Sequence, residues 1–252
     1  MPKKTQPHPA FSLIHADGDP SVLLVCDHAS NAVPAEFNGL GLPPEAFTRH
    51  IAYDIGAAQV TAALSRLLNA PAILAGFSRL LIDPNRGADD PTLVMKLSDG
   101  AIIPGNRHAD AAVIADRIAR YYRPYHQAIA DRIAAARAKG VAPAILSLHS
   151  FTPVFQGRER PWQIGILWDR DARIAAPLLA SLRADGKLCV GDNQPYSGEL
   201  VGDCMYQHGT MNRLPHVLIE VRQDLIVDKS GAEHWAQLLA EVLQPILKKL
   251  ER

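Results

Sequence analysis

Three apolar runs in the sequence each end in a side chain that can bind a metal ion or transfer a proton. The runs and the residues that follow them are 144–148 with His149, 21–26 with His28, and 217–219 with Glu220. Open α/β sheets place their ligands at the carboxyl ends of the strands, so we expect these side chains to meet at one edge. Neutral imidazoles suit Zn²⁺, and catalytic zinc sites keep one position for water. The pattern therefore predicts a metal-dependent hydrolase.

A third metal ligand should be another carboxylate or histidine. Asp54 is one candidate, although it could equally act as the N-cap of the helix that follows it. Asn31 lies three residues after His28, but a neutral amide is a poor zinc ligand. Asp27 is adjacent to His28 and could orient that ring from outside the metal site.

Glu220 is the candidate general base, because a glutamate that ends an apolar strand faces either the core or a cleft. In a cleft beside a metal ion it could take a proton from water and return it to the leaving amine. The alternative is a buried salt bridge with Arg222 or Arg213.

Arg79, Asn85 and Arg86 form a second polar group that suits a substrate with one or two free carboxylates. Guanidinium groups bind carboxylates through two parallel hydrogen bonds, and the neighbouring amide adds donors. The alternative is that these arginines pair with nearby acidic residues, namely Asp83, Asp89 or Asp90.

Two further residues are candidates for substrate binding. Tyr196 lies in the turn-rich loop 193–198, which could fold over a ligand, and His208 could supply another pocket imidazole or be an ordinary surface histidine. The sequence has no Gly-x-Ser-x-Gly, Gly-x-Gly-x-x-Gly or Walker A motif, which disfavours serine hydrolases and nucleotide-binding folds.

The elements that would position these residues alternate between strands and helices. We predict strands at 21–26, 72–75, 79–83, 144–148, 163–168 and 217–221, and helices at 57–69, 110–139, 174–184 and 231–250. We also predict a short helix start at 44–47, a helix break or kink at Pro124, long loops at 87–107 and 191–202, and a flexible arm at 1–12. This order indicates one α/β domain over 1–252, with a largely parallel central sheet flanked by helices.

Composition restricts the class of protein. The chain has 252 residues, 48% of them hydrophobic, and a formal net charge of zero, which argues against a nucleic-acid partner or an anionic membrane surface. No apolar run reaches the roughly 18 residues that span a bilayer, and the polar first residues do not resemble a signal peptide. The three cysteines form no disulfide framework. We therefore expect a soluble, cytoplasmic protein; the pattern does not indicate an oligomeric state.

Six motifs, in this order along the chain, resemble those of the N-formylglutamate amidohydrolases, a family similar in fold to the zinc carboxypeptidases and acylases. They are Cys26-Asp-His-Ala-Ser-Asn31, Ser78-Arg-Leu-Leu-Ile-Asp-Pro-Asn-Arg86, Tyr122-Arg-Pro-Tyr-His126, Ser147-Leu-His-Ser150, Asn193-Gln-Pro-Tyr-Ser-Gly198 and Ile219-Glu-Val-Arg-Gln-Asp224. None of these motifs is specific alone, but together they are, and the resemblance covers about residues 20 to 245.

The resemblance implies zinc-dependent hydrolysis of the amide bond of N-formyl-L-glutamate, or of a related N-acyl amino acid. It implies that His28 and His149 bind Zn²⁺ or another divalent metal, that Glu220 is the general base, and that Arg86 with Asn85 and Arg79 holds the substrate carboxylates. Zinc carboxypeptidases use His-x-x-Glu for the first two ligands, whereas Asn31 stands at the glutamate position here, so we favour Asp54 as third ligand. The alternatives are another metal-dependent exopeptidase or deacylase, and a non-catalytic relative that binds carboxylates.

Overall fold

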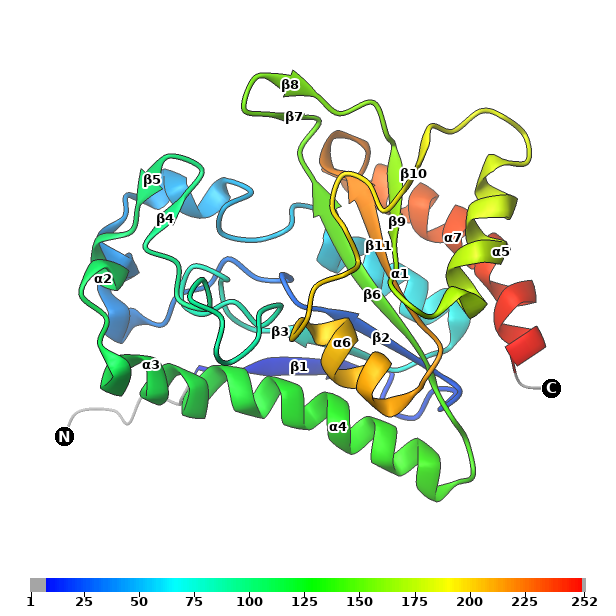
Figure 1. Ribbon diagram of the computed structural model, residues 1–252, viewed down its shortest axis with the longest axis horizontal. Coiled ribbons are helices and arrows are strands. Elements are labelled where there is room, and N and C mark those ends of the chain that lie inside the picture. Colours follow the sequence, from blue (N-terminus) through cyan, green and yellow to red (C-terminus); the bar gives the residue numbers. More distant parts are fainter. Residues whose placement is uncertain (1–7, 251–252) are drawn as a thin grey trace.

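Strand β6, Ala144–Phe151, lies at the centre of the sheet, and all eight of its residues are buried. A computed structural model describes residues 8–250 of the chain (Figure 1). The seven strands of the sheet are, in spatial order, β1 (Phe11–Ile14), β3 (Ala72–Ala75), β2 (Val22–Cys26), β6, β11 (His216–Arg222), β9 (Ile164–Leu167) and β10 (Val190–Asp192). All neighbours are parallel except the pairs β1–β3 and β11–β9. The prediction of an α/β domain with a largely parallel sheet is confirmed.

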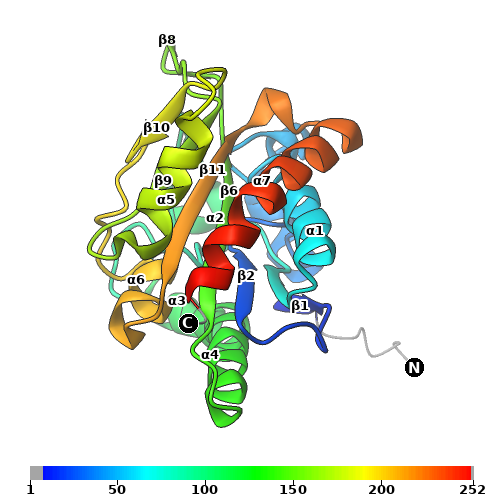
Figure 2. The same ribbon diagram turned by 90° about the vertical axis from the view of Figure 1, so that its right-hand side faces the viewer.

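Helices cover both faces of this sheet (Figures 1 and 2). One face packs against α1 (Ala57–Leu68), α5 (Ala172–Arg183) and α7 (Lys229–Leu250). The other packs against α4 (Arg123–Ala138) and α6 (Cys204–His208). Helix α3 (Ala111–Arg117) precedes α4 along the chain, and α2 (Pro104–Arg107) contacts the 3₁₀ segment Ala35–Gly41. No helix within residues 8–250 is long and apolar enough to cross a membrane.

The central strands change character on one face near their carboxyl ends. Leu146 and Leu148 of β6 and Ile219 of β11 contribute to the core beneath α1 and α7. Because side chains alternate along a strand, His149 and Glu220 project from the opposite face, and the sheet register places these two residues side by side. Polar side chains thus replace apolar ones where the adjacent strands β2, β6 and β11 end.

The strand predicted at 79–83 is wrong. The apolar residues Leu80, Leu81 and Ile82 are fully buried, which explains the pattern, but the backbone turns instead of extending. Its backbone groups bond to loops, since Ser78 N–H donates to the Ala32 carbonyl and Arg79 N–H to the Ala52 carbonyl. A buried apolar run is therefore not sufficient evidence for a strand.

The helical span predicted at 110–139 is divided into two α-helices just before Pro124. A π-helical turn, Ile118–Tyr122, joins α3 to α4, and Pro124 lies in the first turn of α4. The wider turn is consistent with the proline, which has no N–H to donate to the preceding turn. The short helix start at 44–47 is confirmed as a 3₁₀ turn at Pro44–Thr48.

Several segments predicted to be irregular contain short elements. The loop at 87–107 holds the hairpin of β4 (Leu97–Ser98) and β5 (Ala101–Ile102), followed by α2. A second hairpin, β7 (Val154–Phe155) with β8 (Arg158–Glu159), follows β6. Of the arm predicted at 1–12, residues 1–7 lie outside the described residues, whereas Phe11 and Ser12 belong to β1.

Candidate active site

Three buried side chains converge beyond the ends of β2 and β6. The Asp54 Oδ2 atom lies 2.8 Å from His149 Nδ1 and 3.4 Å from His28 Nδ1. The two imidazole rings meet edge to face, with centroids 4.9 Å apart. The structure thus brings together the three residues for which we predicted a metal ion.

The outer nitrogen of each ring contacts a second carboxylate. His28 Nε2 lies 2.7 Å from Asp83 Oδ1, and His149 Nε2 lies 2.9 Å from Asp27 Oδ2. A carboxylate accepts hydrogen bonds, so each Nε2 carries the hydrogen and each Nδ1 is left with its lone pair when the ring is neutral. Carboxylates in this position orient histidines that bind metals. The prediction that Asp27 orients His28 is wrong, because Asp27 contacts His149 across the sheet.

The charges of this cluster fit a cation. Burial alone would raise the pKa of Asp54, yet the charge of His28 and the hydrogen bond from His149 hold it well below its usual range. Burial opposes a charge on His149, but its hydrogen bonds to Asp27 and Asp54 raise the pKa of the ring well above normal. The cluster therefore retains a proton among the Nδ1 atoms of His28 and His149 and the Oδ2 atom of Asp54. Without a proton, the lone pairs of these three atoms would repel each other. A divalent metal with nitrogen and oxygen ligands, such as zinc, suits the same place.

Asp54 is aimed at this cluster by the turn before α1. The residue that precedes the helix is Gly56, which has a φ of 82°, so the alternative role of Asp54 as N-cap is wrong. A side chain at position 56 would collide with the Ile226 carbonyl oxygen, 2.3 Å from the ideal Cβ position. Asn31 points elsewhere, because its amide donates to the Phe47 carbonyl at 2.7 Å.

Glu220 is buried beside the cluster, with 6% of its surface exposed, and its Oε2 atom has no hydrogen-bond partner within residues 8–250. Arg222, the suggested salt-bridge partner, pairs instead with Asp224 at 2.8 Å. Burial, reinforced by the charge of Asp54 and opposed by that of His149, raises the pKa of Glu220 to about 7. An unpaired buried carboxylate is costly in a folded protein, so its retention indicates a functional role.

The two arginines of the predicted carboxylate site differ. Arg79 is already paired, with its guanidinium 2.9 Å from Asp83 and 3.6 Å from Asp54. Arg86 makes no ion pair in the described part of the chain and donates only to the Asn85 carbonyl at 2.9 Å. The Asn85 side-chain oxygen accepts from the Cys204 N–H at 3.0 Å, which leaves its amide nitrogen available to a ligand.

A cavity of about 350 Å³ joins these residues. It is lined by eight of the nine predicted site residues, His28, Asp54, Arg79, Asn85, Arg86, His149, Tyr196 and Glu220. His208 is the exception: it is buried in α6, 2.8 Å from His126, and does not line this cavity. Within residues 8–250, the residues proposed for metal binding, for proton transfer and for carboxylate binding therefore line one pocket.

Two carboxylates at the candidate site were not predicted from the sequence. Asp83 was considered only as a partner of the arginines, but it also contacts His28. Asp203 lines the cavity and precedes α6, and its sequence context resembles an ordinary helix cap. The position of Asp83 after an apolar run was a usable signal, because His28 and His149 occupy the same kind of position. Asp203 had no such signal.

Comparisons with known proteins agree with this geometry. The model of the N-formylglutamate amidohydrolase family matches residues 20–227. The crystal structure of a gene product from Agrobacterium tumefaciens superposes with a TM-score of 0.91 at 36% identity, over 96% of each chain. The N-formylglutamate amidohydrolase from Ralstonia eutropha JMP134 superposes with a TM-score of 0.72 at 23% identity, over 96% of this chain and 98% of that one. A comparison with curated proteins found no match. Because the family model matches most of its length, the chain belongs to the N-formylglutamate amidohydrolase family and is an amidohydrolase.

Proposed function

We propose that this protein is a metal-dependent enzyme that hydrolyses the amide bond of N-formyl-L-glutamate or of a related N-acyl amino acid. Hydrolysis adds water across the C–N bond and releases formate, or another acid, and the free amino acid. The observation that carries this proposal is the unpaired Oε2 atom of Glu220, buried in the same pocket as the His28, Asp54 and His149 cluster.

His28, Asp54 and His149 would hold the metal ion, because their ligand atoms converge and their charges suit a cation. A bound divalent metal supplies a Lewis acid and lowers the pKa of a water molecule. Asp83 and Asp27 hold the two rings in the orientation that keeps each Nδ1 lone pair directed inward.

Glu220 would act as general base and then as general acid. With a pKa of about 7, it can accept a proton from water and return it to the leaving amine nitrogen near neutral pH. Arg86 would bind the substrate carboxylate, assisted by the amide of Asn85. Tyr196 is 44% exposed at the pocket, and its hydroxyl accepts from Arg160 at 3.1 Å, so it is placed to close over a ligand.

An amidase screen with zinc present tests this function. N-formyl, N-acetyl and N-succinyl amino acids would be supplied to protein purified without chelator, and release of the free amine would be measured. We expect hydrolysis that is lost with chelator and restored by zinc. A protein that binds one zinc per chain but hydrolyses none of these compounds would contradict the proposal.

A further inference from the structure

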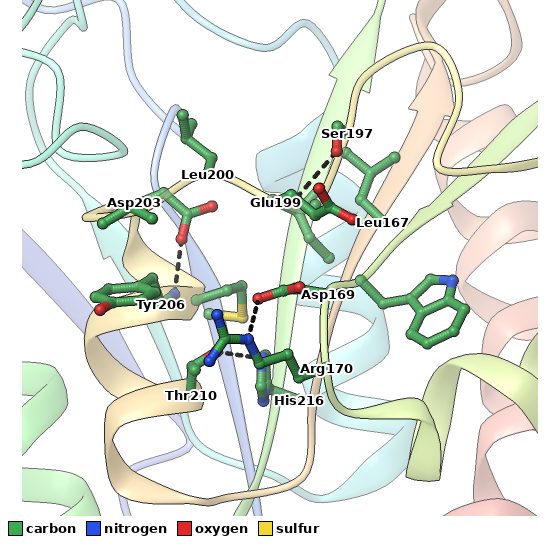
Figure 3. A pocket seen from close by; sticks show the side chains of 15 residues that line it. Leu167, Asp169, Arg170, Ser197, Glu199, Leu200, Asp203, Tyr206, Thr210 and His216 are labelled. Carbon is green, nitrogen blue, oxygen red and sulfur yellow. Dashed lines mark hydrogen bonds and ion pairs between the residues drawn. The ribbon is translucent and has the colours of Figure 1, made fainter.

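A second cavity, of about 240 Å³, adjoins the proposed catalytic pocket, and Figure 3 shows the side chains that line it. The two cavities share five lining residues, Leu167, Ser197, Leu200, Asp203 and Leu218. A substrate whose carboxylate and amide lie in the first cavity can therefore extend its side chain into the second. The chemistry of this second cavity then selects the amino acid.

Apolar side chains line part of the second cavity. Leu167 and Leu218 are buried on β9 and β11, and Leu200 contributes from a loop. Met205 of α6 also lines the cavity and is buried. These side chains suit a chain of methylene groups, which gains free energy when it leaves water.

The charged groups around the second cavity are mostly acidic. Asp169, Glu199 and Asp203 supply three carboxylates, and Arg170 supplies the only guanidinium among the lining residues. Arg170 is 82% exposed and its Nε lies 3.4 Å from Asp169, so it offsets the charge of that carboxylate but not those of Glu199 and Asp203. The cavity therefore presents net negative charge to an occupant.

The His216 ring makes its hydrogen bonds within the protein. Its Nδ1 lies 2.9 Å from the Leu214 carbonyl, which can only accept a hydrogen bond, so this nitrogen carries a hydrogen. Its Nε2 lies 3.2 Å from the Thr210 hydroxyl, which can donate to it. Both ring nitrogens have partners when the ring is neutral.

Asp203 is the buried acidic group nearest to both cavities. It is 4% exposed, and its Oδ1 accepts from the Tyr206 N–H at 2.6 Å, which caps α6. Its other carboxylate oxygen has no hydrogen-bond partner among residues 8–250, and Figure 3 shows it directed into the cavity. A buried carboxylate with a free oxygen is stabilised by a cation or a hydrogen-bond donor.

The two guanidinium groups of the first cavity differ in their availability to a substrate carboxylate. Arg79 is already paired with Asp83 and Asp54, so Arg86 is the guanidinium available for the α-carboxylate. A side-chain carboxylate, as in glutamate, would enter the acidic second cavity without a free guanidinium to meet it.

We infer that the second cavity binds the side chain of the substrate, and that it selects a long side chain with a cationic end, as in an N-acyl lysine or arginine. The methylene groups would pack on Leu167, Leu218 and Met205, and the cation would reach Asp203. This inference rests on the proposed function, and it specifies the substrate class that the same site takes.

Three N-formyl amino acids of similar length test the charge preference. We expect kcat/KM to be about tenfold higher for N-formyl-L-lysine than for N-formyl-L-norleucine, and lowest for N-formyl-L-glutamate, as one charged hydrogen bond implies. Asp203→Asn keeps a residue that can cap α6 but removes the charge, so it should reduce the lysine-to-norleucine ratio by about tenfold. The control Asp110→Asn changes another N-cap far from both cavities and should leave the ratio unchanged.

Calorimetric binding of the same compounds separates this inference from the proposed function. The Glu220→Gln variant would be titrated with each compound, so that affinity is measured without turnover. The order lysine, norleucine, glutamate supports the inference even if the wild-type protein hydrolyses none of them. A protein that hydrolyses and binds the glutamate compound best would retain the proposed function and overturn the inference, as would an Asp203→Asn variant with an unchanged ratio.

Discussion

Two groups of three buried side chains in the described part of the chain carry the residue types that bind metals. The first is the cluster of His28, Asp54 and His149 at the carboxyl ends of the central strands. The second consists of His126, Cys204 and His208, from α4 and α6. In each group the potential ligand atoms lie within 4.8 Å of one another. Proximity and residue type alone therefore do not distinguish them.

Three of the four imidazole nitrogens in the second group have hydrogen-bond partners within residues 8–250. His126 Nε2 lies 3.0 Å from the Pro84 carbonyl and must carry the hydrogen, so its Nδ1 accepts from His208 Nε2 at 2.8 Å. Burial lowers the pKa of His208 to about 3, with a contribution from the charge of His126, and burial raises the pKa of the Cys204 thiol. These shifts favour neutral side chains, and the two imidazoles are hydrogen-bonded to each other.

The first group differs in its carboxylates. Asp27, Asp54 and Asp83 surround two imidazoles, and both inner nitrogens face an oxygen that cannot donate. Buried negative charge requires positive charge nearby, so this cluster is stabilised by a proton or a metal ion. The direction of the hydrogen bonds and the local charge, more than the donor types, therefore favour the first group as the candidate metal site.

The largest expected effect is the loss of catalysis when Glu220, which lies beside the first group, is replaced. Glu220→Gln should lower kcat by about 10²–10⁴-fold, because the amide cannot accept a proton, while zinc content stays the same. Steady-state kinetics and metal analysis would measure both, with the exposed Glu233→Gln on α7 as the control. Turnover that survives in the Glu220 variant would remove this residue as the base.

Zinc stoichiometry would test the comparison directly. Asp54→Asn should lose stoichiometric zinc, because it removes a charged ligand from between two imidazoles. His208→Gln, in the second group, should keep the zinc content of the wild type. Metal analysis after dialysis against a fixed free zinc concentration gives both values; a loss of zinc in the His208 variant would mean that the second group also binds metal.

Removing an orienting carboxylate should have a smaller effect. Asp83→Asn weakens the hold on the His28 ring, and we expect zinc affinity to fall by about 10–100-fold. Competition with a chelating dye would measure the dissociation constant. Asp89→Asn, an exposed residue that follows in the chain, should leave the affinity unchanged. Equal affinities in the two variants would contradict the role of Asp83.

The smallest effect concerns the acid stability of the second group. The pKa of His208 is about 3 in the folded chain and about 6.5 when unfolded, so between these values only the unfolded chain takes up the proton. The contribution of the buried neutral His208 ring to the free energy of unfolding is complete above pH 6.5 and decreases as the pH falls towards 3. The Tm of His208→Gln should therefore fall less between pH 7 and pH 5 than that of the wild type. Parallel Tm curves would indicate that the ring is not buried in its neutral form.

The sequence was sufficient for the main elements and for most residues of the pocket. Apolar runs that end in His28, His149 and Glu220 identified three strands correctly. A strand that is buried on both faces requires a continuous apolar run, whereas the residue at its end can be polar. The same reasoning failed at 79–83, where Leu80 to Ile82 are buried but the backbone turns instead of extending. Backbone N–H groups there donate to carbonyls of distant loops, and the local sequence pattern carries no information about these partners.

Tertiary structure alone decided which groups act together. The bond from Asp27 to His149 joins residues 122 positions apart, and the contact from Asp54 to His149 joins residues 95 positions apart. These pairs depend on the adjacency of β2, β6 and β11 in the sheet, although other strands lie between them along the chain. The side-chain cavity likewise combines residues of β9, β11, α6 and a loop. The sequence by itself determined the chemical types at the strand ends, because local periodicity specifies them. Partners, charge balance and the shape of the second cavity came only from the packing of distant segments.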